Sequence, residues 1–396
     1  MGNLADMETD LKHELEIDRV LVEIEREIDL LLNITPVNAA DAWHDFERSG
    51  FAGTPTLRSR PLGFEPDLLR RRLYDLEVEK VEDSALANLF TEKRDELGRE
   101  LTLLEDRDTS RFVHESLQLF GDVGAELVRD AYELLSSISI DPSDDDRVTA
   151  TGFAEAAERE LEHYRSAYTG FSSTLDIRDD VSDLMVSNGE LLIPSTAYFR
   201  SSRVEPLIQH EVGTHVVTYQ NGMRQPLTLL ATGLPGYDET QEGLAVLSEY
   251  VCGGLDPNRL RLLAARVVAV DRLLQRAEFL EIFQELHDEH GFPPRTAWGI
   301  AIRVARSGGL TKDVIYLRGI TRVLEFAAER KTIEPLLVGK LSLDHVPLIE
   351  DLTKRQILQP AWIRPRWTQG EAAEERLERV FEGMRVIDLV GESISG

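Results

Sequence analysis

The segment LIQHEVGTHVV, residues 207–217, places two histidines and a glutamate inside an otherwise apolar run. His210 and His215 are two of only nine histidines in the chain, and Glu211 directly follows the first. Neutral imidazoles are ligands of catalytic zinc, and a glutamate beside them can remove a proton from water. The segment therefore predicts a metal site with His210 and His215 as ligands and Glu211 as general base.

The five-residue spacing of these histidines does not suit a regular α-helix. Positions i and i+4 lie only about 40° apart around a helix axis, whereas i and i+5 lie about 140° apart. A π-type turn, with hydrogen bonds between i and i+5, would bring both imidazoles to one face. We expect such a turn between His210 and His215, at Gly213 and Thr214. The alternative is an amphipathic helix that carries two unrelated histidines.

A third ligand is available in a second predicted helix, DETQEGLAVLSEY at 238–250, where Thr240 could act as the helix cap. The candidates are Glu242, Glu249 and Glu239. Glu242 stands beside Gly243, which is small enough to let two helices approach closely, and we favour it for that reason. It could equally be a first-turn acid that the helix dipole stabilises.

The composition excludes several classes of protein. Lys and Arg total 44 against 72 Asp and Glu, a formal net charge of −28, which argues against a nucleic-acid binder, an anionic membrane surface and a strongly acidic partner. The single cysteine, Cys252, rules out an internal disulfide and a cysteine-based zinc cage. The acidic start lacks a signal-peptide pattern, and no apolar run approaches the ~18 residues of a membrane span. We expect a cytoplasmic protein, and the composition does not indicate an oligomeric state.

Helical periodicity dominates the sequence. Helices are expected at about 7–32, 66–78, 83–104, 109–119, 122–138, 150–167, 203–220, 240–252, 257–276, 278–289, 294–306 and 312–329, followed by a tail punctuated by prolines. Short apolar runs at 173–200, with Asn188-Gly189 as a turn, predict a small antiparallel sheet. A loop at 138–147, rich in aspartate, separates an expected helical N-terminal region, 1–148, from a second region, 149–396.

Three segments together resemble one known family: HEVGTH at 210–215, QEGLA at 241–245 and GGLTKDVIYLRG at 308–319. In this order they resemble the family that includes the microtubule-associated tyrosine carboxypeptidases and the bacterial flavohemoglobin expression-modulating QEGLA-motif proteins. The resemblance covers about 150–345. It implies an HExxxH zinc metallopeptidase in which His210, His215 and Glu242 bind Zn²⁺ and Glu211 is the general base. In the eukaryotic members the reaction is removal of a C-terminal tyrosine, chiefly from α-tubulin.

The periodicity and this resemblance lead us to expect an α+β fold, predominantly α. The helical N-terminal region would precede a zincin-like catalytic domain that contains the small sheet. The strand ELLIPS at 190–195 could then accept a peptide as an additional strand, with a plain core strand as the alternative.

A carboxypeptidase of this kind also needs an oxyanion donor and a cation for the terminal carboxylate of its substrate. Tyr316 is the expected donor, because it lies in the third segment, four residues after Lys312 on a predicted helix. A core tyrosine is the alternative. The candidate cations are Lys312, Arg318, Arg203 and Arg200, with Lys312 first because of its motif. Each could instead be a solvated surface charge.

The expected function is therefore that of a zinc-dependent carboxypeptidase that acts on the C-terminus of a peptide or protein and releases an aromatic residue, Tyr or Phe. Two alternatives are a zinc hydrolase of a non-peptide amide and a regulatory binding protein that retains the metal site without turnover. Glu211 favours catalysis, because a purely structural metal site needs no base and is usually closed by four protein ligands.

Overall fold

The computed structural model describes residues 11–140, 146–181 and 183–394 of the chain. The described part is predominantly helical with a few short strands, which confirms the expected fold class. The chain forms two compact units: unit 1 comprises Met1–Arg19, Asp141–Asp256 and Arg318–Gly396, and unit 2 comprises Val20–Ile140 and Pro257–Leu317. These units are made of interleaved segments, whereas the sequence suggested two consecutive regions that meet at residues 148 and 149.

All regular elements among the described residues of unit 2 are helices. Its elements are α2 (Lys12–Ile28, which begins in unit 1), α3 (Leu30–Ile34), α4 (Ala39–Arg48), α5 (Pro66–Tyr74), η1 (Val78–Lys80), α6 (Ser84–Glu105), α7 (Phe112–Phe120), α8 (Ala125–Ser137), α14 (Pro257–Leu274), α15 (Phe279–Gln284), η4 (Glu285–Glu289), α16 (Pro294–Ala305), η5 (Arg306–Gly308), η6 (Lys312–Val314) and the start of α17 (Ile315–Arg330). Helix α8 packs against α14, and α6 packs against α5 and α7. Aromatic contacts also hold α4 in place: Trp43 meets Trp298 edge to face at 5.5 Å between ring centroids.

Unit 1 contains all the described strands. Its elements are β1 (Arg147–Thr149), α9 (Ala150–Ala167), β2 (Leu175–Arg178), β3 (Met185–Ser187), β4 (Glu190–Pro194), β5 (Tyr198–Arg200), η2 (Ser201–Arg203), α10 (Val204–His210), η3 (Glu211–Val216), α11 (Val217–Met223), α12 (Leu229–Thr232), α13 (Tyr237–Val251), the end of α17, η7 (Glu334–Leu337), η8 (Leu343–His345), α18 (Val346–Lys354), η9 (Arg366–Thr368), α19 (Glu371–Glu382) and η10 (Val386–Ile394).

The sheet of unit 1 has the strand order β2-β4-β3, and a separate antiparallel pair joins β1 to β5. Strands β3 and β4 form the expected antiparallel hairpin, with positive φ of 48° at Asn188 and 78° at Gly189. Strand β2 is parallel to β4, a pairing that the sequence did not predict. Strand β4 is hydrogen-bonded to β2 through residues 191–194 and to β3 through residues 190–192, so a peptide cannot add as a strand at these positions.

The core of unit 1 fixes the orientation of the helical run 204–223. Apolar residues of this run pack with α9 and β4 in one buried cluster that includes Ile208, Val212, Val216, Phe153, Leu161, Leu191 and Ile193. Burial of these side chains is the main source of stabilisation, at about 25 cal/mol per Å² of apolar surface removed from water. The buried apolar face therefore leaves the histidines of the run to face α13, which also packs against α10 and η3.

Several predicted boundaries differ from the structure. The helix expected at 7–32 is interrupted at Asp29, whose φ of 35° separates α2 from α3, and residues 7–10 lie outside the described residues. Helix α13 begins at Tyr237 and not at the predicted residue 240, so Thr240 is not its cap; its hydroxyl accepts a hydrogen bond from the Leu343 amide at 2.9 Å. The tail contains α18 and α19, which were not predicted. Among the described residues, none of the helices has the length and apolar character that a membrane span requires.

Candidate metal centre

The predicted irregular turn is present: residues Glu211–Val216 form one π-helical segment, η3, between α10 and α11. The Val217 amide donates to the Val212 carbonyl, five residues earlier, as π-type bonding requires. Two side chains bond to carbonyls in or next to this turn: Trp367 Nε1 donates to the Gly213 carbonyl at 3.1 Å, and Thr214 Oγ1 donates to the Gln209 carbonyl of α10 at 3.0 Å. These bonds stabilise a turn that costs ordinary α-helical hydrogen bonds.

Gly213 is required by packing within this turn. A Cβ atom at Gly213 would lie 2.5 Å from Gln209 Oε1 and 2.9 Å from Trp367 Cδ1. Neither neighbour moves easily, because the Gln209 amide donates to Glu160 and Glu205 and the Trp367 indole donates to the Gly213 carbonyl. The glycine therefore allows Trp367 to lie directly on the π-turn.

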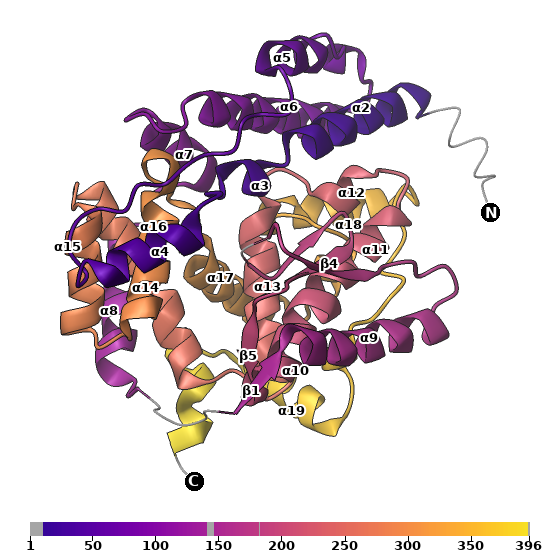
Figure 1. Ribbon diagram of the computed structural model, residues 1–396. Helices are drawn as coiled ribbons and strands as arrows, with labels where there is room; N and C mark the ends of the chain where they lie inside the picture. The colour runs from indigo at the N-terminus through magenta and orange to yellow at the C-terminus, as the bar shows by residue number, and fades with distance from the viewer. Residues whose placement is uncertain (1–10, 141–145, 182, 395–396) are drawn as a thin grey trace. The chain divides into compact units, whose positions relative to one another are not determined.

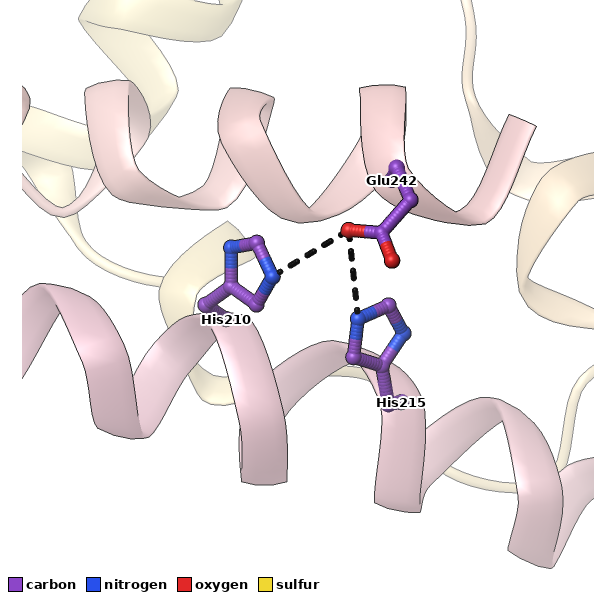
Figure 2. Close-up of side chains that lie close together, drawn as sticks. All are labelled: His210, His215 and Glu242. Carbon is purple, nitrogen blue, oxygen red and sulfur yellow. Dashed lines mark ion pairs between the residues drawn. The ribbon is translucent and has the colours of Figure 1, made fainter. Parts of the chain in front are cut away.

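The π-turn brings His210 and His215 to one side, where Glu242 of α13 points at both imidazoles (Figure 2). Glu242 Oε2 lies 3.4 Å from His210 Nε2 and 3.8 Å from His215 Nε2. One ligand atom from each of the three residues lies within 4.8 Å of the other two, and the imidazole planes are at 83° to each other. Tetrahedral zinc, with bonds of about 2.0–2.2 Å, separates its ligand atoms by about 3.3–3.5 Å. Two imidazoles and one carboxylate at these distances fit catalytic zinc, with one coordination position left for water.

A carboxylate holds His210 from the side opposite Glu242. His210 Nδ1 lies 2.8 Å from Glu249 Oε1, and Glu249 is fully buried. If Nδ1 carries the proton and donates it to Glu249, then Nε2 presents its lone pair towards Glu242 and a metal ion. Arg203 donates to the other oxygen of Glu249 at 2.5 Å and to the Gly254 carbonyl at 3.0 Å. Glu249, one of the alternative third ligands, is therefore engaged with His210 and Arg203.

His215 is held by a neutral partner. The Gln241 side chain lies close enough to His215 to act on its pKa, and Gln241 Oε1 accepts from Thr218 Oγ1 at 2.8 Å. Gln241 and Thr218 are both buried. The two imidazoles therefore have different partners, a carboxylate for His210 and an amide for His215.

This difference appears in the pKa values of the metal-free histidines. Burial by itself would lower the pKa of His210, but hydrogen bonds to Glu242 and Glu249 and the charge of Glu211 outweigh it and raise the pKa to about 9. Burial lowers the pKa of His215 to about 4, and the nearby charges of His210 and Lys340 act in the same direction. Glu211 itself is buried directly beside the cluster. The surroundings of metal-free His210 therefore favour the protonated imidazole, and those of His215 favour the neutral one.

Helix α13 carries Glu242 at a fixed depth because it crosses α17 in direct backbone contact. A Cβ atom at Gly243 would lie 2.3 Å from the Gly319 carbonyl, and a Cβ atom at Gly319 would lie 2.1 Å from the Glu239 carbonyl. Gly243 does let two helices approach closely, as the sequence suggested. The partner helix contributes Gly319, which is the last residue of the third motif segment.

Most of the predicted arginines and the remaining third-ligand candidate bind one another or the partner of His210. Arg318 and Arg322 bind Glu239, the remaining alternative third ligand, and Arg203 binds Glu249. Arg200 is exposed on β5.

Lys312 and Tyr316 belong to unit 2. The Lys312 ammonium lies 5.0 Å from the ring centroid of Phe120, and the Arg266 guanidinium lies 4.6 Å from that of Tyr316. Their suggested roles in substrate binding and oxyanion stabilisation stay predictions.

Sequence reasoning missed the partners of the histidines and one cation. Gln241 could have been found from its place in the QEGLA motif, beside Glu242. Lys340, which lies close enough to His215 to lower its pKa, follows Gly339 in a loop with no recognisable pattern. Trp367 lies 154 residues from the carbonyl that it binds, so the sequence carries no local sign of the contact.

The fold and site together define a helical α+β protein in which a π-turn and α13 bring together a partly buried His-His-Glu cluster, the ligand set of a mononuclear metal centre. A family model described as microtubule-associated tyrosine carboxypeptidase matches residues 44–385. The chain therefore belongs to the microtubule-associated tyrosine carboxypeptidase family.

Two curated relatives show the extent of the similarity. The chain is 32% identical over 157 residues to human microtubule-associated tyrosine carboxypeptidase 1, covering 36% of this chain and 32% of the relative. It is 27% identical over 196 residues to the protein of the same name from Mus musculus, covering 46% of this chain and 40% of the relative. The matches thus span about a third to two fifths of the length of these relatives.

Proposed function

We propose that this chain is a zinc-dependent carboxypeptidase that releases an aromatic C-terminal residue, Tyr or Phe, from a peptide or protein. The observation that carries the proposal is the convergence of His210, His215 and Glu242, with Glu211 beside the first histidine. The names of the relatives, which are tyrosine carboxypeptidases, support the reaction class and the aromatic preference.

A zinc ion held by His210, His215 and Glu242 would supply an acidic water molecule and polarise the peptide carbonyl. Glu211 would act as the base that accepts a proton from water and as the acid that returns it to the leaving amine. The Glu249 carboxylate keeps His210 in the tautomer that presents Nε2, and Gln241 orients His215. Trp367 holds the π-turn, on which the spacing of the two ligands depends.

The decisive experiment uses the zinc-loaded full chain and a mixture of peptides that end in different residues. We expect mass spectrometry to show loss of a single C-terminal residue, fastest from peptides that end in Tyr or Phe. Glu211→Gln should lower kcat/KM by roughly 10²- to 10⁴-fold while zinc stays bound, because it removes the base and leaves the ligands. His215→Ala should lose both zinc and activity.

Glu325→Gln is the matched control, because Glu325 is an exposed glutamate of α17 in the same unit. It should retain the activity and zinc content of the parent protein. Full activity of Glu211→Gln would overturn the proposed base. Cleavage only at internal peptide bonds, or hydrolysis of non-peptide amides without any peptide hydrolysis, would overturn the assignment as a carboxypeptidase.

A further inference from the structure

A carboxypeptidase has to place a cation very close to its metal ligands. The terminal carboxylate of a substrate is separated from the attacked carbonyl carbon by only the amide nitrogen and one Cα, a distance of about 3–4 Å. The group that binds this carboxylate must therefore lie beside the metal site.

Three arginines of unit 1 near the site are already bound to protein carboxylates. Arg203 donates to Glu249, and both Arg318 and Arg322 donate to Glu239. Each of these arginines would have to leave a partly buried ion pair in order to bind a substrate, which is costly. They are better suited to fixing α13 than to binding a ligand.

Lys340 is a buried cation of unit 1, with 9% of its surface exposed. Its Nζ lies 5.9 Å from the ring centroid of Tyr219 and 5.6 Å from that of Tyr237. Tyr219 follows His215 by four residues, one helical turn, and Tyr237 begins the helix that carries Glu242. The ammonium therefore lies beside one tyrosine of the helical run that carries His215 and one tyrosine of the helix that carries Glu242.

The backbone around Lys340 is rigidly held. The Lys340 amide donates to the Leu230 carbonyl at 2.7 Å, and the Lys340 carbonyl accepts from the Leu234 amide at 3.0 Å. A Cβ atom at the preceding Gly339 would lie 2.6 Å from the same Leu230 carbonyl, so the loop lies directly against α12. Lys340 is fixed by main-chain bonds on both sides, which limits the positions that its ammonium can reach.

The two tyrosines are held as firmly as the lysine backbone. The Tyr219 ring packs on the hairpin turn, where a Cβ atom at Gly189 would lie 2.3 Å from the ring. The Tyr237 ring packs on Gly233, where a Cβ atom would lie 2.1 Å away and where φ is 139°. Aromatic faces stabilise an ammonium ion without neutralising its charge. A partly desolvated ammonium attracts a carboxylate more strongly than one in water does.

We propose that Lys340 binds the α-carboxylate of the C-terminal residue of the substrate, and that Tyr219 and Tyr237 hold its ammonium in place. The assignment rests on the carboxypeptidase function proposed above. It makes Lys340, and not Lys312 or an arginine, the residue that restricts cleavage to the end of a chain.

The test compares two peptides that differ only in a free or an amidated C-terminal tyrosine, with zinc-loaded parent and Lys340→Met proteins. We expect Lys340→Met to lower kcat/KM for the free acid roughly 10- to 100-fold, the range expected for one lost hydrogen bond to a charged group, and to leave the amide almost unchanged. Lys354→Met, at an exposed lysine of α18, is the matched control and should retain the preference of the parent protein for the acid.

A second measurement does not depend on turnover. Calorimetry on the metal-free proteins should show that the parent binds N-acetyltyrosine at least tenfold more tightly than N-acetyltyrosinamide, and that Lys340→Met loses this difference. An inactive parent protein that retains this difference would refute the carboxypeptidase function and support the assignment of Lys340. The assignment is wrong if Lys340→Met keeps the preference for the acid, if it slows both peptides equally, or if Lys312→Met removes the preference and Lys340→Met does not.

Discussion

Replacement of Glu249 by glutamine tests whether a buried carboxylate tunes the metal centre from outside the ligand set. Glu249 is fully buried and lies 2.8 Å from His210 Nδ1, on the opposite edge of the imidazole from Glu242. Glu249→Gln keeps the shape of the side chain and can still accept one hydrogen bond from His210. It removes the negative charge that makes the imidazole a stronger electron donor.

The size of the effect follows from the kind of hydrogen bond that is changed. A hydrogen bond to a charged group contributes about 1.5–3 kcal/mol and a neutral one about 0.5–1.5 kcal/mol, so the exchange costs about 1–1.5 kcal/mol. This free energy corresponds to roughly tenfold weaker zinc binding, the lower end of the 10- to 100-fold range that is typical for such partners. Arg203 also loses its buried counter-charge, although it keeps the Gly254 carbonyl at 3.0 Å and lies 3.6 Å from Asp256. We therefore expect metal-free Glu249→Gln to lose about 1–3 kcal/mol of unfolding free energy, less than the full cost of breaking a buried ion pair.

The assay is competition for zinc against a chromophoric chelator at fixed pH, with urea unfolding of the metal-free proteins measured in parallel. Glu239→Gln is the control, because Glu239 lies on the same helix and binds Arg318 and Arg322 but neither histidine. It should lower stability without weakening zinc binding. The reasoning fails if Glu249→Gln binds zinc within twofold of the parent, or if Glu239→Gln weakens zinc binding to the same extent.

Two further predictions concern the elements that support the site and unit 2. Gly213→Ala should cost about 1–3 kcal/mol of unfolding free energy and weaken zinc binding, because its Cβ atom would overlap Gln209 and Trp367. Gly299→Ala is the control, because no atom lies within 4 Å of the added Cβ. It should be neutral or stabilising by up to about 1 kcal/mol. Equal effects of the two substitutions in chemical denaturation would contradict this account of the π-turn. Burial would raise the pKa of Asp313, but Arg303, Arg266 and Arg306 outweigh it and hold the pKa well below its usual range. The stabilisation by Asp313 is therefore fully present above its unfolded-state pKa of about 4 and is lost progressively as the pH falls below that value. Asp313→Asn should lower the free energy of unfolding at pH 7 by about 3 kcal/mol. The variant should also lose less stability in acid than the parent protein does. A pH-stability curve of the variant that runs parallel to that of the parent would refute this role.

The ligand cluster could be predicted because its elements are local. Five-residue spacing of His210 and His215 conflicts with an α-helix, and a π-turn removes the conflict within six residues, Glu211–Val216. Helix positions were also predictable from apolar periodicity, most accurately for α9, where the expected and observed spans agree. The parallel pairing of β2 with β4 was not predictable, because β3 lies between them in the sequence but on the far side of β4 in the sheet.

The third motif segment makes specific packing contacts in the structure. The chemistry that its residues suggested stays a prediction, and several of these residues pack within unit 2. Thr311 bonds to Ser116, Asp313 binds Arg303 through two hydrogen bonds of 2.7 and 2.8 Å, and Gly308 approaches the Thr109 carbonyl so closely that a Cβ atom would lie 2.4 Å away. A segment with such specific contacts would be distinctive in a family whether or not it touches a substrate.

The two acids of α13 illustrate how much a helical spacing can determine. Glu242 and Glu249 are seven residues apart, so they lie on the same helix face and are separated by about 10.5 Å along the axis. A single imidazole fits between them: His210 directs Nε2 to Glu242 at 3.4 Å and Nδ1 to Glu249 at 2.8 Å. From sequence alone either acid could be the ligand, because both face the same way. The choice depends on His215, whose Nε2 lies 3.8 Å from Glu242. A metal ion needs all three ligands around one point, and only the acid beside both imidazoles can provide the third, so the other acid becomes the partner that orients His210.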